Sequence, residues 1–309
     1  PGVSVLQAAA ARLCISWRDI VTVSLHGRGD MLVLRRALAR SERVGVYTDP
    51  ENTPDRIAAF LKRIGAEDFR VHVLENLFGE RERISCLSPE QAAKESFAEP
   101  NFVLLERTLP PRIELTPGMP EESLEREQGL ISKPEVRLAA LGRLQPKNGH
   151  TLWDIGAGSG SLSLEASLVI REGRILAVER DESRAAQIET NIVGTGAFGV
   201  EVILDTAPAC FQRLPDPDLI FLGGGAGQGH YLLDEAWSRL RPGGRLVASL
   251  VLLGSLQAVL DWARAKGLQP ELTQIQVSRS APLQGDLRLA ALNPVFLLSL
   301  HKRPESEMS

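Results

Sequence analysis

A glycine-rich turn in the middle of the chain constrains the fold more than any other feature of the sequence. The stretch LWDIGAGSGSLSLEASLV, residues 152–169, has an apolar run, then three alternating glycines, then a helical pattern. Such a turn brings backbone N–H groups and a helix N-terminus close to a ligand. The sequence therefore predicts a strand, a ligand-binding turn and a helix at this point, the first unit of a nucleotide-type α/β domain.

Apolar segments alternate with helical patterns through the second half of the chain. The segment SKPEVRLAALGRL predicts a helix with Ser132 at its N-cap and Pro134 in its first turn. The strand candidates that follow are HTLWDI, RILAVE, VEVIL, DLIFLG and GRLVASLV. They predict a doubly wound, Rossmann-like parallel sheet. The last two candidates, ELTQIQVS and NPVFLLSLHK, have no good helix between them and predict a terminal antiparallel pair.

Prolines mark a boundary between two α/β parts. The segment RTLPPRIELTPGMPEE holds four prolines, so we expect a linker over residues 109–120. Residues 1–108 predict a smaller α/β domain with strands at IVTVSLHG, RVGVYTD, FRVHVLENL and NFVLLER. Within it, TPDRIAAFLKRIG predicts a helix that Thr53 caps and Gly65 stops. Residues 121–309 are expected to form the larger domain.

Composition excludes several classes of protein. The formal net charge is −4, so no overall basic field attracts nucleic acid, and we expect no nucleic-acid partner. The three cysteines, Cys14, Cys86 and Cys210, lie far apart, which indicates free thiols in a reducing cytoplasm and no metal site. The apolar runs are too short to cross a bilayer, and no signal peptide is visible, so we expect no membrane partner.

Two classes of cofactor fit the glycine turn. The dinucleotide fingerprint G-x-G-x-x-G is matched by Gly156 and Gly158, but its third position is Ser161. The D-x-G-x-G-x-G loop of S-adenosyl-L-methionine (SAM) methyltransferases is matched completely by Asp154, Gly156, Gly158 and Gly160. The pattern favours SAM. The alternative, that the glycines only permit a tight strand-to-helix turn, stays open.

The ends of the following strands carry further candidates. Glu179 ends the second strand and is placed to accept two ribose hydroxyls, although an acid there also suits NAD. Asp205 to Ala207, after the third strand, are expected to frame the adenine. Gly223 to Gly225 follow the fourth strand, where enzymes that methylate amide or exocyclic nitrogens often carry an Asn-Pro-Pro-Tyr motif. The glycines argue against such substrates and suggest that the backbone approaches a large flat one. A flexible loop is the alternative.

The second half of the chain resembles the decarboxylating precorrin methyltransferases of cobalamin synthesis, over about residues 118–302. The segments that carry the resemblance are GMPEESLEREQGLISKPEVRLAALGRL, LWDIGAGSGSLSLEAS, FLGGG and LAALNPVFLLSL. The signature R-E-x-G-x-I-[TS]-K-x-E-[IV]-R, here Arg126 to Arg137, is more specific than the glycine loop. In the first half, PGVSVLQAAAARL and VSLHGR resemble the C-terminal subdomain of tetrapyrrole methylases that act on carbon 5.

Enzymes that fuse the two modules are the precorrin-6Y methyltransferases. The resemblance implies SAM-dependent methylation of a precorrin at carbons 5 and 15, with loss of carbon dioxide from the acetate on carbon 12. It also implies assembly, since family members of the second module form homotetramers. Two departures are a valine at Val5, where the family usually has serine, and the lack of an upstream G-x-G-x-G-D subdomain. We therefore expect the first module to be incomplete and inactive at carbon 5, and the native protein to be longer.

Site residues follow from the pattern and from the resemblance together. The expected cofactor-binding residues are Ser132, Asp154, Gly156, Ala157, Gly158, Ser159, Gly160, Glu179, Asp205 and Ala207. The expected substrate-binding residues, mainly cations for the substrate's carboxylates, are Arg126, Lys133, Arg137, Gly223, Gly224, Arg279 and Arg288. The candidates for catalytic residues are His26, Arg137, Gly224 and His230.

Three rival functions stay open on sequence alone. An RNA or protein methyltransferase of the same fold is the first, because fold does not determine substrate. The second is a fragment that binds cofactor without activity. The third is an NAD-dependent oxidoreductase, which Ser161 disfavours because the fingerprint needs glycine there.

Overall fold

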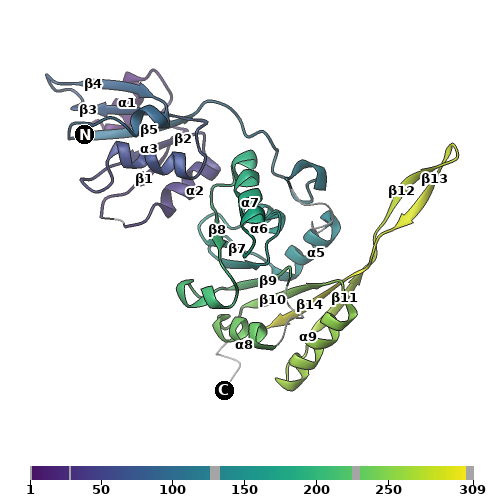
Figure 1. The fold of residues 1–309 in the computed structure, drawn as a ribbon. Coiled ribbons are helices and arrows are strands. Elements are labelled where there is room, and N and C mark those ends of the chain that lie inside the picture. Colours follow the sequence, from purple (N-terminus) through teal and green to yellow (C-terminus); the bar gives the residue numbers. More distant parts are fainter. Residues whose placement is uncertain (1, 28, 126–132, 225–229, 304–309) are drawn as a thin grey trace. The chain divides into compact units, whose positions relative to one another are not determined.

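The chain divides into two compact units in the computed structural model (Figure 1). Unit 1 comprises residues 1–114 and 192–199, and unit 2 comprises residues 115–191 and 200–309. The first change of unit, after Glu114, falls inside the proline-rich stretch 109–120. The structure describes residues 2–27, 29–125, 133–224 and 230–303.

Unit 1 is a five-stranded mixed sheet with strand order β1-β2-β5-β3-β4. Strands β1 and β2 are parallel, and the remaining neighbours are antiparallel. The strands are β1 (Val21–Ser24), β2 (Arg43–Tyr47), β3 (Phe69–Glu75), β4 (Arg83–Leu87) and β5 (Asn101–Arg107). The helices are α1 (Val5–Arg12), α2 (Leu32–Arg40), α3 (Pro54–Arg63) and α4 (Pro89–Ala92).

Two details of unit 1 compare directly with the sequence. Helix α3 begins after Thr53, and Gly65 follows its end with a φ of +70°, as the pattern predicted, although the Thr53 side chain makes no cap hydrogen bond. Strand β4 was missed. It is an edge strand with no fully buried residue, so it lacks the apolar alternation from which a strand is recognised.

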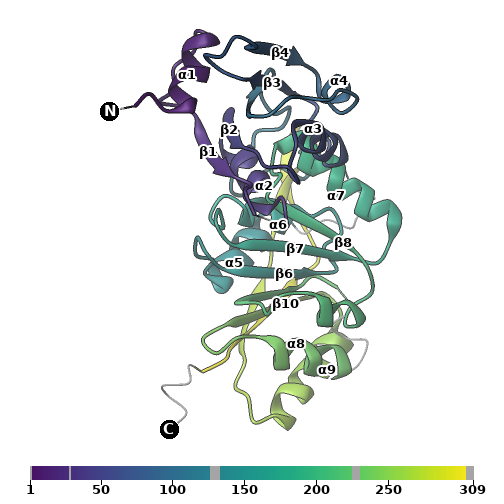
Figure 2. The same cartoon turned by 90° about the vertical axis from the view of Figure 1, so that its left-hand side faces the viewer.

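Unit 2 confirms the doubly wound sheet with a terminal antiparallel pair. Its strand order is β11-β14-β10-β9-β6-β7-β8. Strands β6 to β10 are parallel, while β14 runs antiparallel to both β10 and β11. Figure 2 labels β6, β7, β8 and β10 of this sheet. The strands are β6 (Thr151–Ile155), β7 (Arg174–Glu179), β8 (Val200–Leu204), β9 (Leu219–Leu222), β10 (Arg245–Leu250), β11 (Glu271–Ile275) and β14 (Val295–His301). Its helices are α5 (Pro134–Leu144), α6 (Ser161–Ala166), α8 (His230–Arg239) and α9 (Leu253–Ala265), and α7 (Glu182–Thr195) begins in this unit.

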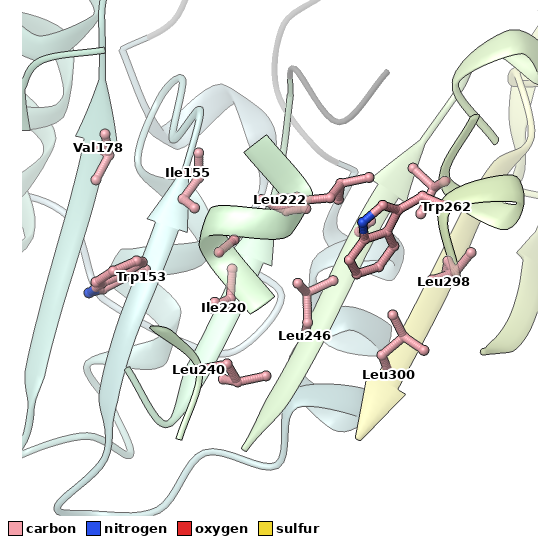
Figure 3. Packing of buried hydrophobic residues seen from close by; sticks show 14 of the residues in the cluster. Trp153, Ile155, Val178, Ile220, Leu222, Leu240, Leu246, Trp262, Leu298 and Leu300 are labelled. Carbon is pink, nitrogen blue, oxygen red and sulfur yellow. The ribbon is translucent and has the colours of Figure 1, made fainter. Parts of the chain in front are cut away.

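Alternate residues of the parallel strands build the core on one face of the sheet. Figure 3 shows Trp153 and Ile155 of β6 on the same side as Ile220 of β9 and Trp262 of α9. Trp153 and Trp262 are almost fully buried there. Asp154, between Trp153 and Ile155 in the sequence, points to the other face of the sheet, where its carboxylate accepts a hydrogen bond from Ser163 of α6. This alternation determines which face of the sheet each side chain points to, as far as the carboxyl ends of the strands.

Two local predictions for unit 2 need correction. The N-cap of α5 is Lys133, not Ser132, because Pro134 already occupies the first helical turn. Ser132 itself lies outside the described residues. The segment between the last two core strands, which contains RSAPLQGDLRLAAL, forms a two-stranded antiparallel sheet, β12 (Ser278–Leu283) and β13 (Asp286–Ala291), which the pattern did not separate into strands.

A buried ion pair joins α5 to α6, the helix that follows the glycine turn. The Arg137 Nε donates to Glu165 Oε1 at 2.8 Å, and neither side chain is exposed. The guanidinium also donates to the carbonyl of Met119. Arg137 was expected to bind substrate and was a candidate for catalysis, but this geometry gives it a structural role instead, because its charge is already matched and cannot reach solvent.

Removal of the Arg137 charge should therefore destabilise the fold. Arg137→Met leaves the Glu165 carboxylate buried without its cation, and we expect the free energy of unfolding to fall by about 3–5 kcal/mol. The matched control is Arg143→Met, which breaks the exposed pair with Glu271 and should cost less than about 1 kcal/mol. Urea denaturation measures both. Equal losses in the two variants would contradict the structural role, and Arg137→Met/Glu165→Leu should recover much of the loss.

Candidate functional site

A cavity of about 270 Å³ lies at the carboxyl ends of β6, β7, β8 and β9. Ligands of open α/β sheets bind at this edge, in the crevice outside the strand ends. The lining residues are Ile155, Gly156, Gly158, Val178, Glu179, Arg180, Arg184, Asp205, Thr206, Ala207, Gly223, Gly224 and Leu232. Seven of these were expected from the sequence: Gly156, Gly158, Glu179, Asp205 and Ala207 for cofactor, and Gly223 and Gly224 for substrate.

The glycines of the turn are required by its backbone. Gly156, Gly158 and Gly160 have φ values of +71°, +58° and +73°, which side-chain-bearing residues rarely adopt. A Cβ on Gly156 would also lie 3.1 Å from the backbone N of Gly224. These φ values are needed by a tight turn whether or not it binds a ligand, so the case for a ligand depends on the cavity that the turn borders.

Glu179 is held at the edge of the cavity by backbone donors. Its Oε2 accepts a hydrogen bond from the Gly158 N–H at 3.0 Å. Its Oε1 accepts from the N–H groups of Arg180 and Asp181, at 3.0 and 3.1 Å. The carboxylate therefore links the glycine turn to the end of β7 and retains lone pairs for further donors, such as vicinal hydroxyls.

Asp154, expected to bind cofactor, lies beneath the turn and does not line the cavity. It is 1% exposed, and its Oδ2 accepts a hydrogen bond from Ser163 Oγ at 2.7 Å. Burial raises the pKa of Asp154 to about 6; the Ser163 hydrogen bonds oppose this shift and the nearby Glu179 carboxylate adds to it. Asp154 therefore supports the turn from below by fixing the start of α6.

Of the remaining cofactor candidates, some line the cavity and others do not. Ala157, Ser159 and Gly160 belong to the turn but do not line the cavity; the Ser159 carbonyl accepts from the amide of Asn191 at 3.0 Å. Asp205 is ion-paired with Arg213 and accepts from the Thr206 N–H at 2.6 Å.

Sequence reasoning missed Arg180, Arg184 and Leu232, which also line the cavity. Arg180 directly follows the expected acid and could have been found by extending that strand end by one residue. Arg184 and Leu232 come from helices α7 and α8, and no motif singles them out.

The expected substrate-binding residues differ in their partners and in their exposure to solvent. Lys133 donates to the carbonyl of Asn293 at 2.5 Å. Arg279 is paired with Glu121 and Glu135, so its charge is already matched. Arg288 lies exposed on β13. Arg126 and Ser132 lie outside the described residues.

The two histidine candidates are exposed, His230 at the first residue of α8 and His26 in unit 1 after β1. In the described part of the chain, no group of three or more His, Cys, Asp or Glu residues is arranged to hold a metal ion. Nor is any described helix long and apolar enough to cross a membrane.

The family model of the precorrin methyltransferase domain matches residues 124–302 of the chain. A precorrin-6Y C(5,15)-methyltransferase [decarboxylating] of Sinorhizobium sp is 34% identical over 293 residues, which cover 92% of this chain and 68% of that protein. A shorter relative, from Pyrobaculum calidifontis, is named probable cobalt-precorrin-6B C(15)-methyltransferase (decarboxylating). It is 36% identical over 189 residues, 60% of this chain and 96% of that protein.

Solved structures agree with the sequence comparisons. The C-terminal domain of precorrin-6Y C5,15-methyltransferase from Rhodobacter capsulatus is 34% identical and aligns with a TM-score of 0.54. The alignment covers 62% of this chain and all of that domain. The cavity therefore lies in the part of the chain that shares both sequence and fold with these proteins, because the strands and loops that line it fall within residues 124–302.

The raised pKa of Asp154 predicts how stability should depend on pH. Since its folded pKa, about 6, exceeds its unfolded value, the buried carboxylate costs nothing when protonated at low pH and destabilises the fold as pH rises. Relative to Asp154→Asn, the wild-type free energy of unfolding should fall by about 2 kcal/mol between pH 4 and pH 7. Urea titrations of both proteins across that range measure the difference. A difference that does not change with pH would contradict the raised pKa.

Proposed function

This chain belongs to the precorrin methyltransferase family, and we propose that it transfers methyl groups from SAM to carbons 5 and 15 of a precorrin, with decarboxylation of the carbon-12 acetate, in cobalamin biosynthesis. One observation carries the proposal. The glycine turn and the Glu179 carboxylate border a cavity at the carboxyl edge of the sheet, within the matched domain. An RNA or protein methyltransferase is disfavoured because the relatives that match across most of the chain are named for precorrins.

The residues at the cavity fit SAM. The turn has no side chain that enters the cavity at Gly156 or Gly158, so a nucleoside can approach the backbone closely. The buried Glu179 carboxylate has lone pairs for the two ribose hydroxyls, and Asp205 to Ala207 line the wall where the adenine would lie. Bound SAM would supply a methyl group on a positively charged sulfur: an electron-rich carbon of the substrate would form a bond to the methyl carbon as the carbon–sulfur bond breaks, and S-adenosylhomocysteine would leave with the electron pair.

The chain contributes position more than activation. A reduced tetrapyrrole already has nucleophilic enamine carbons, so the chief requirement is to hold that carbon in line with the methyl group. Gly223 and Gly224 leave the cavity wall free of side chains beside the turn, which permits a large flat ring to come close. His230, at the start of α8, is our candidate for the proton donor after decarboxylation.

We assign carbon-15 methylation and decarboxylation to unit 2. The shorter relatives of Pyrobaculum are named for carbon 15 and decarboxylation only, and they match a length close to that of the family domain at residues 124–302. The longer relatives, named for carbons 5 and 15, match 92% or more of this chain. The carbon-5 step is then proposed for the kind of module that unit 1 resembles in part, with His26 as a residue of that site; unit 1 by itself is not expected to perform it.

We also propose a homo-oligomer, a tetramer by family resemblance, in the cytoplasm. Leu283, Leu287 and Leu289 are exposed on the β12–β13 arm, and apolar surface of this kind is typical of contacts between subunits. The free thiols of Cys14, Cys86 and Cys210 suit a reducing compartment.

Glu179→Gln tests the ribose contact. We expect SAH (S-adenosylhomocysteine) affinity to fall by about 1.5–3 kcal/mol, because hydrogen bonds to a charged acceptor become neutral ones. The melting temperature should fall too, because the same carboxylate accepts from the Gly158, Arg180 and Asp181 N–H groups.

Calorimetry with SAH and with its 2′,3′-dideoxy analogue separates the two effects of this substitution. The wild type should lose affinity for the analogue, and Glu179→Gln should discriminate much less between the two ligands. Undiminished discrimination by the variant would refute the ribose contact. Glu182→Gln, an exposed neighbour in the first turn of α7, is the control and should change neither affinity nor melting temperature.

The reaction itself is tested by mass spectrometry. With a carbon-5-methylated precorrin and methyl-labelled SAM, we expect a gain of one labelled methyl group and a loss of carbon dioxide, with the label located at carbon 15 by NMR. His230→Ala should slow the decarboxylated product's formation while leaving SAH affinity unchanged. A chain that binds SAH but leaves the precorrin's mass unchanged would contradict the proposed function.

A further inference from the structure

Three consecutive apolar residues lie exposed where β10 ends. Val251, Leu252 and Leu253 are 53%, 70% and 71% exposed, and Gly254 beside them has open space around it. Exposed apolar residues are common singly, but a run of three is an unusual cost to solubility. This run also begins a helix without a side-chain cap, since Leu252 occupies the N-cap of α9 and makes no cap hydrogen bond.

The register of the sheet puts this run beside the proposed cofactor site. Strand β10 pairs in parallel with β9, with Ala248 opposite Leu222. Continuing that register, Leu250 lies level with Gly224, so the exposed run starts one residue beyond the glycine wall of the cavity. The run therefore extends the cavity's edge along the carboxyl ends of the strands.

A cation lies at the same edge. Strand β14 is antiparallel to β10 and pairs Phe296 with Leu250, so the residues just before β14 lie where β10 ends. Among them is Asn293, whose carbonyl accepts from Lys133 Nζ. In the described part of the chain no carboxylate is within ion-pair distance of Lys133, whereas Arg137 and Arg279 are each paired with glutamates.

We propose that Val251, Leu252 and Leu253 form an apolar platform that the flat face of the tetrapyrrole ring covers, and that Lys133 binds one of the ring's peripheral carboxylates. This rests on the proposed function and assigns the ring side of the same site. The occupant must be large, flat and apolar on its face yet acidic at its rim, because the platform is uncharged and the cation lies at its border. The platform's continuity with the glycine wall favours the substrate over a second copy of the chain.

The experiment uses Leu252→Ser/Leu253→Gln in the full chain, with the precorrin titrated in the presence of SAH so that no methyl is transferred. Serine at the N-cap can accept a hydrogen bond from the first turn of α9, so the melting temperature should hold or rise. Ring affinity should nevertheless fall about tenfold, because apolar surface is lost from the contact. SAH affinity should stay within about twofold of wild type, since the platform lies outside the cavity lining.

Two further variants sharpen the test. Lys133→Gln should lower the affinity for the ring by about tenfold at low salt, and ring binding should become less sensitive to salt. Val169→Thr is the matched control, an exposed apolar residue that precedes β7 and so lies at the opposite edge of the sheet; it should leave ring affinity unchanged.

The outcomes distinguish failure of the proposed function from failure of the platform alone. If the wild type binds SAH but not the ring, the proposed function fails and the platform with it. If the wild type binds the ring and the double variant binds it equally well, the platform alone fails. If light scattering shows that the double variant loses its assembly while ring affinity is unchanged, the exposed run is a contact between copies, which also overturns the platform.

Discussion

The hydrogen bond from the Gly158 N–H to the Glu179 carboxylate is the interaction on which the site depends. It joins the glycine turn after β6 to the end of β7, and the same carboxylate accepts from two more backbone N–H groups. A carboxylate fixed in this way faces the cavity without moving, so its remaining lone pairs are preorganised for a ligand. Directly below, Asp154 and Ser163 hold the start of α6. The two acids are close enough for the Glu179 charge to help raise the pKa of Asp154.

The division of labour at the carboxyl edge follows from strand order. Strands β6, β7 and β8 end at the residues that border the part of the cavity proposed to hold the nucleoside, and two glycines follow β9. Strand β10, next in the sheet, is followed by the exposed run of Val251 to Leu253. Along the carboxyl edge of the sheet, the surface thus changes from polar and enclosed at β6, β7 and β8 to open and apolar at β10. A polar cofactor and a large ring would meet where the glycines leave room between them.

The sequence predicted the sheet and most of the cavity because both depend on local patterns. Strand positions follow from apolar runs, and Gly156, Gly158 and Glu179 follow from their place at strand ends. What it could not predict depends on tertiary contacts. Arg137 stands in a family signature, and only the packing of α5 on α6 shows that its charge is used by Glu165. Likewise, Asp154 fits the motif of a ligand contact, yet its side chain turns down to Ser163. The sequence did not predict strand β4, because an exposed edge strand lacks the alternation of apolar and polar residues.

The central claim is that the cavity between the glycine turn and Ala207 holds the nucleoside of SAM, with Glu179 on its ribose. A crystal structure of the chain with SAH tests it most directly. The account predicts both ribose hydroxyls within hydrogen-bond distance of the Glu179 carboxylate, the adenine beside Asp205 to Ala207, and the sulfur directed toward Gly223 and Gly224. Density for SAH at another place, or a ribose that leaves Glu179 without a contact, would contradict it.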